Sequence, residues 1–257
     1  MPYITTYKKA GYIAVTFIST IAILIVFSLD PIEQYPEYHE FVDQRIFFGI
    51  PNFWNVISNL PFLLVGGLGL YSIYSSKKIA LINEFKIAYS LFFLGVSMVA
   101  VGSSYYHLLP SNETLVWDRL PLTISFMSLF SIVISEFTFP KLGKILLWPL
   151  IMVGAYSVYY WLITERQHAG DLRLYFLVQF LPVLVMPLML LLFKPTFTNN
   201  KGYWLLLLAY VLAKLLEYFD AHIYNALFFI SGHSIKHIAA AFGVYLLLLS
   251  YNDREKA

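Results

Sequence analysis

LRLYFLVQFLPVLVMPLMLLLF occupies residues 172–193 and contains a single charged side chain, that of Arg173. A transmembrane helix needs about 20 largely apolar residues, so this segment is long enough to cross a bilayer. Comparable segments predict eight helices in all, at 10–29, 53–75, 85–108, 119–138, 143–163, 172–193, 202–219 and 234–250. The break near Asp220 is weakly marked, because 202–230 is apolar throughout. The sequence therefore predicts an all-α polytopic membrane protein.

Composition excludes the main alternatives to a membrane protein. Of the 257 residues, 59% are hydrophobic and 12% are charged, whereas a soluble chain has about 25% charged residues. Intrinsic disorder needs the opposite balance. The net charge is +2 with scattered cations, so no surface for nucleic acid is indicated. The absence of cysteine excludes disulfides, thiolate metal ligands and a cysteine nucleophile.

The distribution of cations predicts the orientation in the membrane. If the N-terminus is cytoplasmic, eleven of the 17 Lys and Arg residues, including Lys77 and Lys78, lie in cytoplasmic segments. Four lie on the opposite side, and Lys214 and Lys236 lie within helices. By the positive-inside rule both termini are predicted to be cytoplasmic.

Ionisable residues at membrane depth are costly, so each one suggests a function. His233 and His237 are four residues apart near the start of the last predicted helix. Side chains at this spacing share a helix face and could bind one metal ion. The alternative is two interfacial histidines that only form hydrogen bonds with their neighbours.

Ser103 and His107 repeat this spacing at the end of the third predicted helix, before Pro110. In the alternative interpretation Ser103 bonds a helix carbonyl and His107 caps the helix. Asp118 precedes the predicted start of the next helix at 119, where an aspartate commonly acts as an N-cap.

The predicted topology brings these residues to the outer ends of their helices. His107, His233 and His237 would then meet with Ser103 and Asp118 in one leaflet. Three neutral histidines with an open fourth position are typical of catalytic zinc, and a nearby carboxylate can transfer protons. The residues predict a zinc-dependent intramembrane hydrolase that acts on a lipid.

An ordered set of motifs resembles the alkaline ceramidases. The motifs are Phe53-Trp54-Asn55-x-x-Ser58-Asn59, Ser103-x-x-x-His107, Trp117-Asp118-Arg119-Leu120-Pro121 and Gly232-His233-x-x-x-His237. The wider superfamily includes the progestin and adipoQ receptors and the lipid remodelling hydrolases of GPI anchors. The resemblance covers about 53–250 and implies a seven-helix core. Residues 1–52 would then form an additional N-terminal transmembrane helix with an outer acidic loop, and 53–257 the ceramidase-like core.

The resemblance also implies an activity and roles for the candidate residues. His107, His233 and His237 would ligate Zn²⁺, and Ser103 would orient the water or the substrate carbonyl. Asp118 would act as general base and then protonate the leaving amine. The implied reaction is hydrolysis of the ceramide amide to a sphingoid base and a fatty acid. The implied partner is a ceramide-like membrane lipid, with neither nucleic acid nor an obligate protein partner.

The sequence departs from this family at a calcium site. Eukaryotic members carry an acidic N-terminal segment and a Glu just before Phe-Trp-Asn, where this chain has Asn52. Four acids of the loop could supply oxygen ligands for Ca²⁺, but a solvated acidic loop is the preferred interpretation. These acids are Glu33, Glu37, Glu40 and Asp43.

The remaining buried polar residues have separate interpretations. Lys214 and Glu217 are three residues apart and predict an internal ion pair. Asp220 is a candidate hydrogen-bond partner for a metal-bound imidazole. Glu136 is expected to extend to the inner interface.

Three other functions stay open at this point. An ester hydrolase of phospholipids or GPI lipids would use the same residues on another bond. A lipid receptor would hold a structural zinc. A transporter would use Lys214, Glu217 and Asp220 as an ion-pair pathway, but would be expected to show duplicated broken helices.

Overall fold

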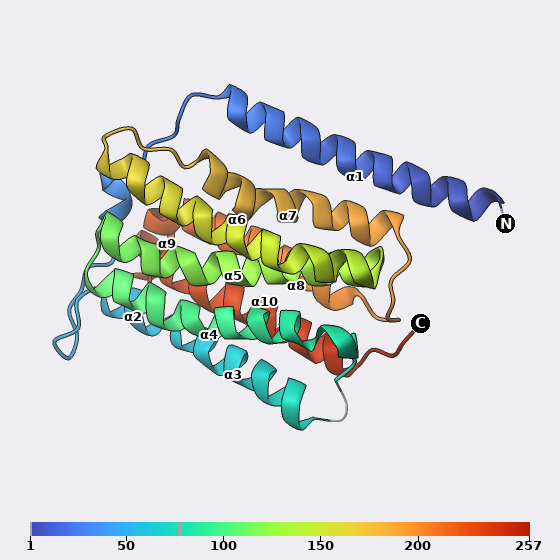
Figure 1. The fold of residues 1–257 in the computed structure, drawn as a ribbon. Helices are drawn as coiled ribbons and strands as arrows, with labels where there is room; N and C mark the ends of the chain where they lie inside the picture. The colour runs from blue at the N-terminus through green and yellow to red at the C-terminus, as the bar shows by residue number, and fades with distance from the viewer. Residues whose placement is uncertain (1, 77–78) are drawn as a thin grey trace.

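The protein is described by a computed structural model that covers residues 2–76 and 79–257 (Figure 1). Lys77 and Lys78, which entered the orientation argument, lie outside the described residues. In the described ranges the chain forms helices and no β-strand. The α-helices are α1 (Pro2–Ser28), α2 (Phe53–Ile57), α3 (Leu60–Ser75), α4 (Lys86–Leu108), α5 (Asn112–Phe137), α6 (Pro140–Arg166), α7 (Arg173–Leu192), α8 (Lys201–Tyr218), α9 (Asp220–Leu227) and α10 (Gly232–Asn252). Short 3-10 helices lie at Pro36–His39 and Asn83–Phe85.

The helices form an elongated bundle, which confirms the predicted all-α polytopic fold (Figure 1). Seven spans among the described residues are long and apolar enough to cross a membrane, with α2 and α3 counted as one span. α8 and α9 pass the same test together, although they bend by 75° at Asp220. The weakly marked break in the sequence is therefore a sharp bend.

The additional helix α1 lies at the edge of the bundle beside α7 (Figure 1). Only 6% of its most apolar window is buried, so most of its apolar surface would face lipid. Tyr12 attaches it to the core by stacking on Phe139 and by a tilted contact with Phe193. The boundary expected after residue 52 stays a prediction.

The fourth predicted helix begins earlier than the sequence suggested. α5 starts at Asn112 rather than at 119, because Ser111 and Thr114 form a capping box. Asp118 is therefore within the helix and is not its N-cap, so the capping interpretation of Asp118 was wrong. Its carboxyl is free to face the interior of the bundle.

Small residues let α4 and α5 approach closely. A Cβ atom at Gly102 would lie 1.8 Å from the carbonyl oxygen of Trp117, and one at Gly95 would lie 2.4 Å from the Ser125 hydroxyl oxygen. Pro121 has no N–H to donate to the Trp117 carbonyl, so that carbonyl is left facing α4. This contact sets the distance between the helix that carries Ser103 and the helix that carries Asp118.

Replacing Gly102 with alanine is expected to destabilise the protein by about 1–3 kcal/mol, the usual cost of overpacking. The added methyl group cannot be accommodated, because the atom it meets is backbone. Thermal unfolding of the detergent-solubilised protein measures the effect. Gly67→Ala is the matched control, since a Cβ at Gly67 meets nothing within 4 Å. Equal stability of the two variants would contradict the proposed close contact.

Glu136 does not extend to the interface as expected. It is buried, and both its oxygens accept hydrogen bonds from Arg254, at 2.6 and 2.8 Å. Tyr89 and Tyr203 also donate to it, at 2.6 and 2.9 Å. A fully bonded ion pair is the form in which two charges can remain at such a site. The network ties the C-terminal residues to the end of α5.

The segment between α1 and α2 folds over the end of the bundle that lies opposite the Glu136 network. The amide of Leu172 donates to the carbonyl of Ile32 at 2.8 Å, and Arg173 donates to the carbonyl of Leu29 at 2.6 Å. The four acids of this segment do not gather at one point. Asp43 is buried in an ion pair with Arg45, whereas Glu33, Glu37 and Glu40 are exposed.

Candidate metal centre

Three histidines meet at the end of the bundle that lies opposite both chain termini (Figure 1). His107 comes from the last turn of α4, and His233 and His237 come from the first turns of α10. One ring nitrogen from each can be chosen so that all three lie within 4.8 Å of one another. His107 and His237 are buried, and His233 is half-buried.

Local contacts determine where α10 begins. Ser231 caps the helix by accepting a hydrogen bond from the amide of Ser234. The Asp220 carboxylate accepts from the backbone amide of His233 at 2.7 Å. A Cβ at Gly232 would lie 2.2 Å from the carbonyl oxygen of Leu216, so glycine permits this close approach to α8. Asp220 therefore supports the metal centre through backbone, not through an imidazole ring.

The ring nitrogens of His107 and His233 have the spacing of two metal ligands. The Nε2 atoms of His107 and His233 are 3.4 Å apart. Two nitrogens bound to one tetrahedral zinc ion at about 2.0–2.1 Å would be about 3.4 Å apart. His237 uses Nδ1 in a 2.9 Å hydrogen bond with Ser58, which leaves its Nε2 available. The donor set thus fits Zn²⁺.

Ser58 is a residue of the site to which the sequence assigned no role. It lies immediately after α2, and its bond to Nδ1 of His237 holds that ring in its orientation. The adjacent Asn55 accepts a hydrogen bond from Ser234 at 2.8 Å, which joins α2 to α10. The signal in the sequence was the place of Ser58 in the motif Phe53-Trp54-Asn55-x-x-Ser58-Asn59.

Ser103 and Asp118 lie together on the neighbouring helices. Ser103 is buried one turn before His107, and its hydroxyl lies close enough to the carboxyl of Asp118 to form a hydrogen bond with it. Both residues line an internal cavity, as does His237. The structure therefore brings a hydroxyl, a carboxyl and the candidate metal-ligating histidines close together, as the sequence predicted.

Phe41, in the segment between α1 and α2, packs over the histidines. Its ring centroid lies 4.6 Å from that of His107 and 5.5 Å from that of His233. The Phe41 side chain is buried and packs in a cluster with Tyr106 and Trp161. No pattern in the sequence indicated this apolar contact.

The cavity has a volume of about 380 Å³, within the range of small-molecule sites. Its inner part is lined by apolar side chains from several helices, including Phe92, Val96, Leu129, Met186, Leu206 and Val244. Its outer part, next to His237, is polar and contains Asp118. Such a division suits a molecule with hydrocarbon chains and a polar head.

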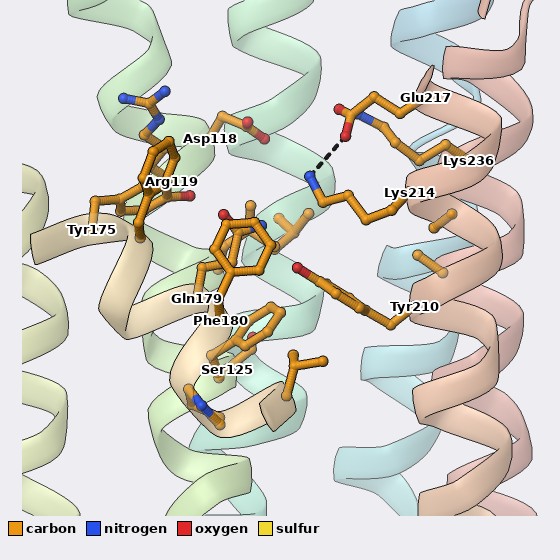
Figure 2. A pocket seen from close by; sticks show the side chains of 18 of the residues that line it. Asp118, Arg119, Ser125, Tyr175, Gln179, Phe180, Tyr210, Lys214, Glu217 and Lys236 are labelled. Carbon is orange, nitrogen blue, oxygen red and sulfur yellow. Dashed lines mark hydrogen bonds and ion pairs between the residues drawn. The ribbon is translucent and has the colours of Figure 1, made fainter. Parts of the chain in front are cut away.

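Opposite Asp118 the cavity wall carries three charged side chains (Figure 2). Lys214 donates to Glu217 at 2.7 Å, as the predicted ion pair requires. Lys236, the neighbour of His237, also donates to Glu217 at 2.7 Å. The ion pair is thus a cluster of three residues that joins α8 to α10. We refer to Lys214, Glu217 and Lys236 as the charged cluster.

Arg119, the residue after Asp118, is buried beside the cavity. Its guanidinium packs over the rings of Trp161 and Tyr175, at 4.1 and 4.8 Å from their centroids, and donates to Gln34. These contacts hold the residue after Asp118 and so help to orient the start of α5.

Comparison with known families agrees with this arrangement. The profile of the family described as Ceramidase matches residues 43–253, most of the chain. The chain belongs to the ceramidase family. Its membership confirms the family predicted from the motifs and supports a ceramide-hydrolysing function, with an amide bond as the target. The matched range contains the three histidines, Ser103 and Asp118, and it excludes α1. No curated protein matches the sequence.

Proposed function

We propose that this ceramidase-family protein is a zinc-dependent amidase that cleaves ceramide-like lipids within the membrane. The products would be a sphingoid base and a free fatty acid. The observation that carries this proposal is the cluster of three histidines, of which His237 lines a cavity together with Ser103 and Asp118. The family match supports the amide bond as the target.

His107, His233 and His237 would hold the metal ion. When bound, Zn²⁺ would polarise the amide carbonyl. It would also lower the pKa of a water molecule, so that this water can lose a proton and attack the carbonyl at neutral pH. The Ser58 hydroxyl would keep the His237 ring in the orientation that presents Nε2. Phe41 would keep bulk water away from the histidines on their outer side.

Asp118 would move the protons of the reaction. Its carboxylate would take a proton from the attacking water as the C–O bond forms. It would then give this proton to the amide nitrogen as the C–N bond breaks, because an unprotonated amide nitrogen is a poor leaving group. The hydrogen bond with Ser103 would hold the carboxyl in position for both transfers.

The cavity would bind the lipid with its amide in the polar outer part. The apolar inner part would receive hydrocarbon chains. With both termini cytoplasmic, the reacting amide would lie in the exoplasmic leaflet, periplasmic or lumenal according to the host membrane. The unequal distribution of cations supports this orientation.

The test is incubation of the purified protein with a ceramide, a phytoceramide and a phospholipid, with product analysis by mass spectrometry. Fatty acid and sphingoid base are expected from the first two substrates. Activity should disappear with a zinc chelator and return when zinc is added. Fatty acid released only from the phospholipid would indicate an ester hydrolase. Lipid binding without turnover would indicate a receptor, and either result would contradict the proposal.

A further inference from the structure

The charged cluster contains more positive charge than an ion pair requires. Lys214 and Lys236 each donate to a different oxygen of the same carboxylate, that of Glu217. One lysine would neutralise Glu217, so the second ammonium is in excess. An uncompensated charge at membrane depth is costly, and such groups are typically functional.

The cluster also has hydrogen-bond donors to spare. A lysine ammonium has three N–H donors and no acceptor. Among the described residues, Glu217 is the only hydrogen-bond acceptor of either ammonium. Lys214 is 40% exposed, and its ammonium points into the cavity (Figure 2). The cluster therefore offers free donors to a molecule in the cavity.

Of the other charges of the cavity wall, Asp118 interacts electrostatically with Lys236 and so offsets only part of this excess. Asp118 lies across the cavity from the cluster (Figure 2) and, in the described structure, forms no ion pair with either lysine. Glu33 lies at the cavity wall but is exposed, and Arg119 adds a further positive charge. A divalent metal ion at the histidines would increase the positive charge further.

We infer that the charged cluster is a binding site for an oxyanion of the lipid, and that a phosphate or sulfonate in the headgroup is its preferred ligand. This inference rests on the proposed function. In an N-acyl sphingoid lipid the carbon that carries the headgroup oxygen is bonded to the carbon that carries the amide nitrogen. An amide beside Asp118 therefore places the headgroup in the polar part of the cavity, facing Lys214.

Turnover of two matched substrates tests the inference. One is an N-acyl sphingoid base with a free terminal hydroxyl, and the other is its terminal phosphate. The wild-type protein is expected to prefer the phosphate by about tenfold in kcat/KM, the low end for a charge-assisted hydrogen bond. Lys214→Gln should remove this preference, while Lys236 and Glu217 remain paired. Lys144→Gln is the matched control, because Lys144 is similarly exposed but pairs with Glu84 away from the cavity.

A binding measurement separates failure of this inference from failure of the proposed function. Displacement of a fluorescent lipid by dodecyl phosphate, dodecanoate and dodecanol needs no turnover. If dodecyl phosphate binds about tenfold more weakly to Lys214→Gln than to the wild-type protein, the result supports the oxyanion site even if no amide is cleaved. Dependence on Lys214 for dodecanoate alone would contradict a headgroup phosphate or sulfonate as the preferred ligand. An unchanged substrate preference with unchanged binding of both anions would overturn the inference and leave the amidase proposal intact.

Discussion

Replacing His107 with alanine is expected to remove bound zinc and to reduce amide hydrolysis by at least about 1000-fold. The reason is that His107 is one of the three described histidines that together could hold a metal ion. Stabilisation of the transition state by a metal ion is worth several kcal/mol, and about 4 kcal/mol corresponds to this factor. Metal analysis of the purified protein and the rate of fatty-acid release measure the two effects.

The ring of His107 is buried against Phe41 and Tyr106, so the fold of the variant is checked together with its metal content. The Nδ1 atom of His107 is buried and has no hydrogen-bond partner in the described structure. His222→Ala is the control, since His222 is exposed on α9 at the same end of the bundle. The control should retain zinc and activity. A His107→Ala protein that folds normally and hydrolyses ceramide at the wild-type rate would contradict the proposed metal centre.

Replacing Asp118 with asparagine is expected to reduce kcat by about 100- to 10,000-fold while zinc remains bound. General acid–base catalysis contributes factors of this size. Asparagine has nearly the same shape and can still bond to Ser103, but it cannot take a proton from water. Retention of the metal distinguishes this variant from His107→Ala.

The control for Asp118→Asn is Glu113→Gln, an exposed acid in the first turn of the same helix. It should leave kcat unchanged. Loss of zinc together with activity in Asp118→Asn would show that Asp118 supports the metal centre, and would contradict its assignment as the proton carrier. An unchanged kcat would contradict it as well.

The sequence predicted the features that depend on local pattern. Long apolar segments predict membrane spans, and histidines four residues apart predict a shared helix face. The convergence of His107 with His233 and His237 followed from the direction of each span. For the same reason, the ion pair of Lys214 with Glu217 could be predicted from their spacing within one helix.

Contacts between distant segments could not be predicted in this way. Ser58 and His237 are separated by 179 residues, and their bond depends on how α2 packs against α10. The partner of Glu136 is Arg254, 118 residues away, which is why an exposed glutamate was expected. The position of Phe41 over the histidines depends on the path of an irregular segment, which has no periodicity to interpret.

The start of α5 was misplaced for a different reason. Residues 112–118 include polar side chains, so a search for apolar segments begins the helix too late. The capping box of Ser111 and Thr114 was the relevant local signal. Recognising it places Asp118 inside the helix, where its side chain can reach the cavity.

The most direct measurement of the central claim is anomalous X-ray scattering from crystals of the purified protein at the zinc absorption edge. A single strong peak is expected about 2.0–2.1 Å from the Nε2 atoms of His107, His233 and His237. No anomalous peak among these three rings in crystals grown with zinc, or rings turned away from one another, would contradict the proposed metal centre.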